Sequence, residues 1–101
     1  MLALGKSMRV IENEQEISIT LPKEFSYETH QSFRSTYISK SKEKSYVVDF
    51  SHVTSLDSTA LGALLILQEH ARSKVILRGA NEDVVKVLTM ASFDEIFTIE
   101  P

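Results

Sequence analysis

The sequence contains no cysteine, and this absence excludes both a disulfide framework and a metal site built from thiolates. Long apolar runs are also lacking, because the longest one, residues 61–67, is far shorter than the ~18 residues that a membrane-spanning helix needs. The first residues, 1–6, lack the basic start and the long apolar centre of a signal peptide. We therefore expect a cytoplasmic protein that does not enter a membrane.

A strong basic charge is missing as well. The net charge is −3, so the chain has no electrostatic footprint for nucleic acid. The nearest approach to a basic run is Lys40, Lys42 and Lys44, which we interpret as a solvated loop. Hydrophobic residues make up 43% and charged residues 25% of the sequence, as in ordinary globular domains. We expect residues 1–101 to form a single domain with one small core, which favours a binding surface over a deep active site.

Apolar alternation predicts two strands near the amino terminus. Met8 and Val10 mark the first strand, and Glu16 to Leu21 show the period of two that is typical of a half-buried strand. Residues 13–15 are the expected hairpin turn between them. Pro22 ends the second strand, because proline cannot donate a hydrogen bond to a neighbouring strand.

Further strands alternate with helices along the rest of the chain. The run Tyr46 to Phe50 predicts a central strand buried on both faces, and Lys74 to Leu77 predict another. A last strand is indicated by Ile96, Phe97 and Ile99. This order predicts an α/β fold with a mixed, partly parallel sheet of about five strands, right-handed crossovers and three to four helices packed on the sheet.

The first helix is expected to begin at Ser26, whose side chain can accept a hydrogen bond from a free amide of the first turn. Tyr27, His30, Phe33 and Tyr37 then recur at spacings of three and four residues, which gives the helix one aromatic-rich face. We interpret this face as core packing rather than as a ligand site.

Two more helices follow. After a loop at residues 51–56, the second helix is expected to begin at Asp57 or Ser58, and its amphipathic pattern is carried by Leu61, Leu64, Leu65 and Gln68. Asn81 is expected to cap the third helix, because its side chain can accept from the first-turn amides. The residues of the third helix that we expect to face inward are Val84, Val85, Val87 and Leu88.

Catalytic patterns are weak in this sequence. His52, Asp57 and Ser58 could in principle form a hydrolase triad, but a serine hydrolase would carry a Gly-x-Ser-x-Gly elbow around the nucleophile. The segment here reads Leu-Asp-Ser-Thr-Ala, and no oxyanion-hole signature accompanies it. We therefore expect that the protein is not an enzyme.

Cofactor and metal patterns are equally weak. His30 and His70 fall on different expected helices, and no His, Asp or Glu cluster has ligand spacing. The triplet Gly5-Lys6-Ser7 resembles the end of a phosphate-binding loop, but the earlier glycine and the preceding strand cannot exist so close to Met1. We expect neither a metal nor a cofactor.

The most informative segment is Asp57-Ser58-Thr59-Ala60-Leu61-Gly62. Its simplest interpretation is a helix cap, because Asp, Ser and Thr are all capping residues. Three such residues in a row exceed what one helix start requires, however. Ala60 and Gly62 also leave the first turn nearly bare, so the backbone of another protein could approach closely.

This arrangement resembles the STAS domain family, the fold of anti-sigma-factor antagonists, over nearly the whole chain. The segments that carry the resemblance are Val47–Phe50, Val53, Leu56–Gly62, Asn81–Leu88 and Ala91–Phe97. The family form has a glycine where Ala60 stands, and many members have a glycine and an aspartate in place of Lys23 and Ser26.

The resemblance implies a partner-switching regulator. In phosphorylated antagonists of the family the acceptor is the serine after the aspartate, which is Ser58 here, and residues 57–62 would bind the partner. It implies that an anti-sigma factor, itself a serine kinase, binds the unmodified protein and that phosphorylation releases it. A PP2C-type phosphatase, or a response regulator that bears one, would restore Ser58. We expect a monomer, because nothing in the sequence demands a dimer.

Two alternative functions are also compatible with the sequence. The first is a STAS subunit that is not phosphorylated and binds the ATPase of a lipid-transport ABC transporter constitutively through the same helix face. The second is a minimal hydrolase that uses Ser58.

Overall fold

The computed structural model describes residues 8–101, so the Gly5-Lys6-Ser7 triplet lies outside the described residues. The strands are β1 (Arg9–Glu12), β2 (Glu16–Thr20), β3 (Glu24–Phe25), β4 (Ser45–Asp49), β5 (Ser55–Leu56), β6 (Ile76–Arg78) and β7 (Thr98–Glu100). The helices are α1 (His30–Tyr37), α2 (Ser58–His70) and α3 (Glu82–Met90), with 3₁₀ turns η1 (Tyr27–Thr29) and η2 (Phe93–Glu95).

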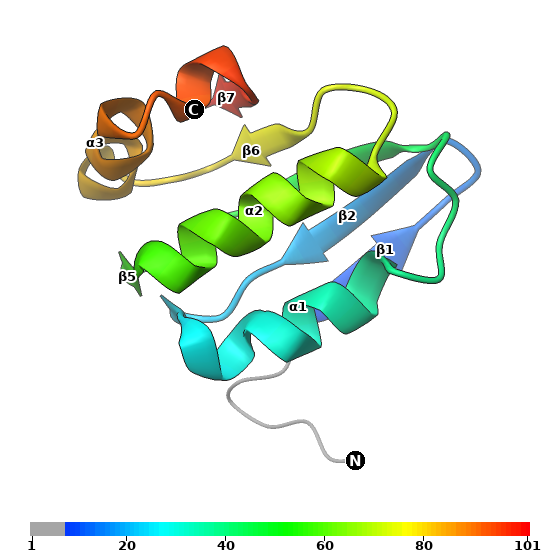
Figure 1. Ribbon diagram of the computed structural model, residues 1–101, viewed down its shortest axis with the longest axis horizontal. Helices are drawn as coiled ribbons and strands as arrows, with labels where there is room; N and C mark the ends of the chain where they lie inside the picture. Colours follow the sequence, from blue (N-terminus) through cyan, green and yellow to red (C-terminus); the bar gives the residue numbers. More distant parts are fainter. Residues whose placement is uncertain (1–7) are drawn as a thin grey trace.

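The main sheet of residues 8–101 has five strands in the order β1-β2-β4-β6-β7. Only the β1–β2 pair of this sheet is antiparallel, and the other neighbours are parallel. A helix connects each parallel pair, and α1 and α2 lie side by side over one face of the sheet (Figure 1). The mixed, partly parallel α/β fold that we predicted is confirmed.

A second, much smaller sheet was not predicted. Glu24 and Phe25 of β3 pair in parallel with Ser55 and Leu56 of β5. Each strand has two residues, which is too short for a period of two to be visible in the sequence. This small sheet replaces the end of the expected loop at residues 51–56 and lies where α1 and α2 begin (Figure 1).

The core lies between the main sheet and the helices. The register places Ile17 beside Tyr46 and Ile19 beside Val48, and all four side chains are buried. They belong to one apolar cluster that also contains, from α1 and α2, Phe33, Tyr37, Ala60, Ala63, Leu64 and Leu67. The expectation that β4 is a central strand is confirmed by its place between β2 and β6.

Two of the four aromatic positions expected on one face of the first helix do not reach the core. Phe33 and Tyr37 are buried, but Tyr27 is 66% exposed and His30 is half-buried. The chain begins this segment as the 3₁₀ turn η1, which has three residues per turn and therefore shifts the phase relative to an α-helix. The shift turns Thr29 inward and leaves Tyr27 outside.

Only some of the apolar side chains of α2 and α3 face the core. In α2, Leu64 and Leu67 are buried, whereas Leu65 is exposed. In α3, Val84 and Leu88 are buried, whereas Val87, which we expected to face inward, is 40% exposed. Both helices thus keep apolar side chains on their outer surfaces. None of the helices in the described part of the chain has the length and apolar character needed to cross a membrane.

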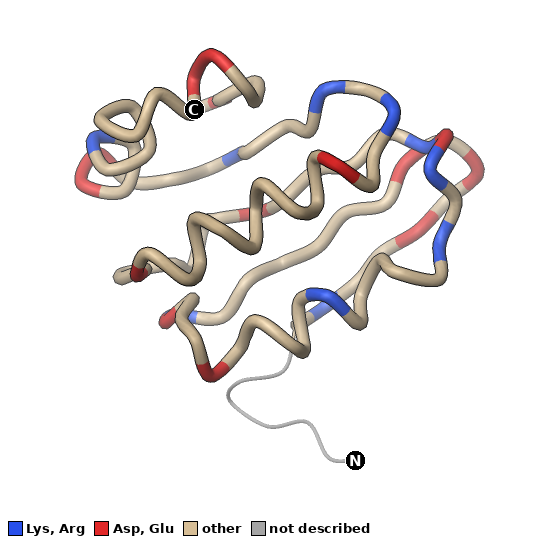
Figure 2. The backbone as a smooth tube through the Cα atoms, viewed as in Figure 1, with Lys and Arg blue, Asp and Glu red and all other residues tan. Residues whose placement is uncertain are grey.

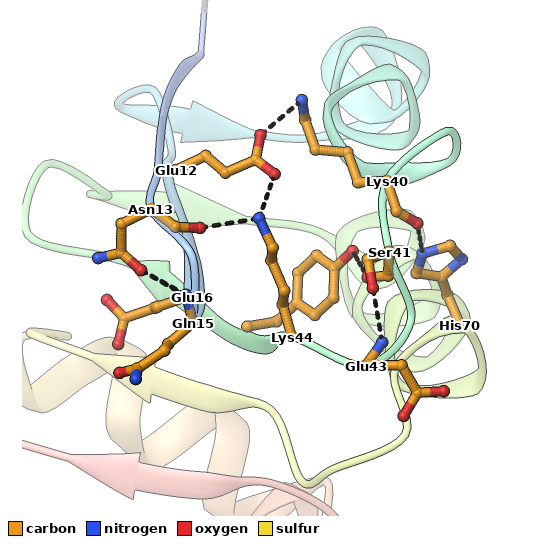
Figure 3. A network of polar contacts seen from close by, with 10 residues as sticks. Glu12, Asn13, Gln15, Glu16, Lys40, Ser41, Glu43, Lys44 and His70 are labelled. Carbon is orange, nitrogen blue, oxygen red and sulfur yellow. Dashed lines mark hydrogen bonds and ion pairs between the residues drawn. The ribbon is translucent and has the colours of Figure 1, made fainter.

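The prediction that Lys40, Lys42 and Lys44 lie in a solvated loop is partly wrong. Lys40 and Lys44 both pair with the carboxylate of Glu12, at 3.0 and 2.8 Å, and Lys44 also donates to the Asn13 carbonyl at 2.8 Å (Figure 3). Both lysines hold the pKa of Glu12 below its ordinary value through these hydrogen bonds. The network ties the β1–β2 hairpin to the segment that leads from α1 to β4, so it braces the end of the sheet where α1 finishes.

The contrast between adjacent leucines of α2 gives a test of the fold. We expect Leu64→Ala to lower the free energy of unfolding by about 2–5 kcal/mol, because it leaves a cavity in the core. Leu65→Ala should cost about 1 kcal/mol or less, since Leu65 is already 37% exposed. Urea denaturation of the two variants measures the difference, and equal costs would show that α2 is rotated from the orientation described.

Candidate functional site

Asp57 links the beginnings of two helical segments. It is the N-cap of α2, and its Oδ1 accepts a hydrogen bond from the Ala60 backbone N–H at 2.9 Å. Its Oδ2 accepts another from the backbone N–H of Tyr27 at 3.1 Å, thirty residues earlier in the chain. One carboxylate therefore caps α2 and also holds η1, which leads into α1, against the start of α2.

These hydrogen bonds affect the titration of Asp57. The pKa of its carboxyl group is lowered, mainly by the backbone N–H of Ala60 and further by that of Tyr27. Hydrogen bonds of this kind stabilise the charged form of a carboxyl group. Asp57 therefore carries its negative charge at neutral pH, beside the amino-terminal end of α2, where the helix dipole favours it.

Ser58 is the first residue of α2 and is exposed. Its position follows from the cap, because Asp57 has an extended backbone with φ −115° and ψ −178°, and helical geometry begins at the next residue. Thr59 is half-buried and Asp57 is exposed. A group attached to the Ser58 side chain would thus extend from the surface of the domain.

The rest of the segment 57–62 does not lie on one surface. Ala60 is fully buried in the core, so its side chain is not part of the surface on which we expected it. Leu61 is half-buried and packs against the core. A Cβ atom placed on Gly62 would meet no atom within 4 Å, so the helix is bare at this position, as we expected. The candidate surface is therefore formed by Asp57, Ser58, Thr59 and Gly62.

An apolar groove between α1 and α2 was not visible in the sequence. Its cavity volume is about 250 Å³. The residues that line it are His30, Phe33, Arg34 and Tyr37 from α1 with Thr59, Gly62, Ala63 and Ile66 from α2. Small residues at a spacing of three or four in α2 could have indicated a close approach to another helix, but nothing in the sequence indicated that α1 is that helix.

A second, wider depression of about 760 Å³ lies at the ends of β1, β2 and β4. It is lined by polar and apolar residues that include Arg9, Thr20, Asp49 and His52. A hydrolase triad would require the Asp57 carboxylate to accept a hydrogen bond from a histidine ring. The side-chain hydrogen bonds of Asp57 in the described part of the chain go instead to the backbone amides of Ala60 and Tyr27. The contacts of Asp57 are those of a helix cap.

The other histidines make hydrogen bonds to the backbone. His30 Nδ1 lies 2.7 Å from the Tyr27 carbonyl oxygen, and His70 Nε2 lies 3.1 Å from that of Lys40. His70 is buried beside Tyr37 and Tyr46, which makes it a structural residue at the end of α2. Within residues 8–101, no group of three or more His, Cys, Asp or Glu side chains is placed to hold a metal ion.

The two roles of Asp57 can be separated by Asp57→Asn. An asparagine still caps α2 through its side-chain oxygen, but its amide nitrogen cannot accept from the Tyr27 N–H. We expect hydrogen exchange at the Tyr27 amide to become faster while exchange at Ala60 changes little. Asp57→Ala should accelerate both, and NMR-detected exchange measures each amide.

The same interaction predicts a pH dependence. The pKa of Asp57 is lowered in the folded state, so its contribution to stability is complete above the ordinary pKa of an aspartate. It is lost as the pH falls through the lowered value. The wild type should therefore lose more stability on acidification than Asp57→Asn does. Urea denaturation of both proteins over a range of pH measures this difference. Parallel pH profiles of the two proteins would contradict the assignment.

Comparison with known proteins places the fold and the site in a family. Residues 7–101 match the family model of the STAS domain. A STAS-domain containing protein of Pseudomonas aeruginosa strain UCBPP-PA14 is 36% identical over 89 residues, which cover 84% of this chain and 88% of that protein.

Solved structures share the fold at low sequence identity. A candidate anti-sigma factor antagonist from Thermotoga maritima superposes with a TM-score of 0.79 at 20% identity, covering 93% of this chain and 86% of the other. The anti-sigma factor antagonist SpoIIAA in its unphosphorylated form gives a TM-score of 0.65 at 13% identity, covering 89% and 97%. With the family match over residues 7–101, these likenesses lead to one conclusion: the chain belongs to the STAS domain family.

Proposed function

We propose that this STAS domain is an anti-sigma-factor antagonist whose binding to its partner is switched off by phosphorylation of Ser58. The observation that carries the proposal is the place of Ser58, exposed at the first position of α2 and next to the capping carboxylate of Asp57. The likeness of the fold to SpoIIAA and to the Thermotoga maritima protein, both named as antagonists, supports it.

The fold should tolerate the modification. A phosphate adds a charge of about −1.5 to −2 and three strong acceptor oxygens. At the start of α2 the free backbone amides and the helix dipole favour negative charge. Because Ser58 is exposed, the phosphate needs no space in the core. The modified domain should therefore keep its structure.

The interface with the partner should not tolerate a phosphate on Ser58. A partner that covers Asp57 and Ser58 already faces one carboxylate, and phosphorylation would place a second, larger negative charge beside it. Burying that charge without a basic counterpart is strongly unfavourable. A loss of about 3–4 kcal/mol weakens binding several hundredfold, which is enough to release the partner.

The proposed circuit has three further components. An anti-sigma factor that is also a serine kinase binds the unmodified domain and transfers a phosphoryl group from ATP to Ser58. A PP2C-type phosphatase, alone or as part of a response regulator, removes the phosphate. The domain acts in the cytoplasm, where ATP is available, as a monomer without a catalytic role of its own.

Incubation with ATP and candidate serine kinases from the same genome tests the phosphorylation. The wild type should gain one phosphate by intact-mass analysis, and Ser58→Ala should gain none. Thr59→Val, which removes only the neighbouring hydroxyl, serves as the matched control and should still be modified. A phosphate that persists in Ser58→Ala would contradict the site, and no phosphate with any kinase would favour constitutive binding to an ABC-transporter ATPase.

Ser58→Asp tests the consequence of the charge. We expect this variant to keep the melting temperature of the wild type within a few degrees, because the change lies on the surface. Its affinity for the anti-sigma factor should fall by at least tenfold in calorimetric titration, since one carboxylate imitates only part of the phosphate charge. Normal binding, or an unfolded variant, would contradict the proposal.

A further inference from the structure

The groove between α1 and α2 is apolar along its length and has charge on one side only. Among Ser58–His70 of α2, the one residue with a formal charge is Glu69 near the end (Figure 2). Arg34 of α1 is the only Lys, Arg, Asp or Glu side chain among the described residues that line the groove. An occupant would therefore need an apolar surface with a negative charge beside it.

The size of the groove narrows the choice of occupant. At about 250 Å³ it falls below the roughly 300–1,000 Å³ of sites that enclose a small molecule or cofactor. It is large enough for apolar side chains inserted from outside. Its walls are two neighbouring helices that run in the same direction (Figure 1), and an amphipathic helix lies readily in a groove of that shape.

The fold itself does not require the groove to be empty. Glycine weakens a helix interior, yet Gly62 stands in the second turn of α2, where an added Cβ would meet no atom within 4 Å. The position has no positive φ that would demand glycine. A larger residue would therefore fit the helix and fill the groove, so the packing of the described residues does not require glycine at this position.

The groove is continuous with the surface around Ser58. Thr59 and Gly62 belong both to its lining and to the segment 57–62. Two exposed apolar side chains lie at the groove: Ile66, which lines it and is 52% exposed, and Tyr27, which is 66% exposed and whose ring contacts that of the lining residue His30. A partner that covers Ser58 would thus reach the groove without crossing a charged part of α2 (Figure 2).

We propose that the groove binds an amphipathic helix of the anti-sigma factor, which inserts apolar side chains between α1 and α2 and pairs an acidic side chain with Arg34. The inference rests on the proposed function and adds the kind of partner surface to it. It also gives the phosphate on Ser58 a second effect. The phosphate would lie beside an acidic helix, so repulsion would add to the cost of burying its charge.

The first experiment measures binding of the anti-sigma factor to Gly62→Leu. The leucine should fill the groove and lower the affinity at least tenfold, while the melting temperature stays the same or rises. Thr89→Leu places the same side chain at an exposed position of α3 and is the matched control, which should bind normally. Arg34→Glu should also lower the affinity for the anti-sigma factor at least tenfold. Arg34→Lys, which keeps the positive charge, should retain most of the wild-type affinity.

The second experiment needs no partner. Octanoate has an apolar chain and a carboxylate, and octylammonium has a chain of the same length with the opposite charge. In amide NMR titrations at millimolar concentration, octanoate should shift the signals of Thr59, Gly62 and Ile66 in the wild type but not in Gly62→Leu. Octylammonium should bind more weakly, because Arg34 repels it.

The outcomes separate the two proposals. The groove proposal is overturned if the anti-sigma factor binds Gly62→Leu as tightly as the wild type, or if Thr89→Leu is the variant that loses binding. Neither result would contradict the proposed phosphorylation of Ser58. If no kinase modifies Ser58, the proposed function fails, and the octanoate titration decides the groove. Equal shifts with both amphiphiles, or shifts elsewhere, would overturn the groove proposal.

Discussion

The two hydrogen bonds accepted by Asp57 fix the part of the molecule on which the proposed function depends. One oxygen holds the Ala60 amide and thereby sets where α2 begins, and the other holds the Tyr27 amide and thereby sets where the segment before α1 lies. Because α2 begins directly after this residue, Ser58 is left exposed at the helix end where added negative charge is favourable. The same bridge holds η1 against the start of α2, and the groove lies between α2 and the helix α1 that follows η1.

The two ends of the domain differ in how their surface groups are paired. At the end where α1 finishes, Glu12 joins Lys40 and Lys44, and His70 meets the Lys40 carbonyl, so polar groups are paired among themselves (Figure 3). At the end where both helices begin, the surface keeps apolar side chains, a bare glycine and an exposed serine. Charge can change at the second end without disturbing the ion pairs at the first, as the proposed phosphorylation of Ser58 requires.

The sequence predicted the elements well and their contacts less well. The strand Tyr46–Phe50, the start of α2 and the cap at Asn81 followed from local patterns, because periodicity and capping act over a few residues. The exposure of the Tyr27 side chain could not be predicted from local patterns, because it depends on a 3₁₀ turn. The β3–β5 pair could not be predicted either, because each of these strands has only two residues. The groove and the Asp57–Tyr27 hydrogen bond join segments thirty residues apart, and no single-sequence pattern indicates such contacts.

The central claim is that phosphorylation of Ser58 changes the surface of the domain and leaves its core unchanged. Amide NMR spectra of the unmodified and the kinase-phosphorylated protein test it most directly, together with hydrogen exchange of the buried β4 amides. We predict that signals move only around residues 57–62 and Tyr27 and that exchange in β4 stays as slow as before. Shifts throughout β2 and β4, or faster exchange in β4, would contradict the account.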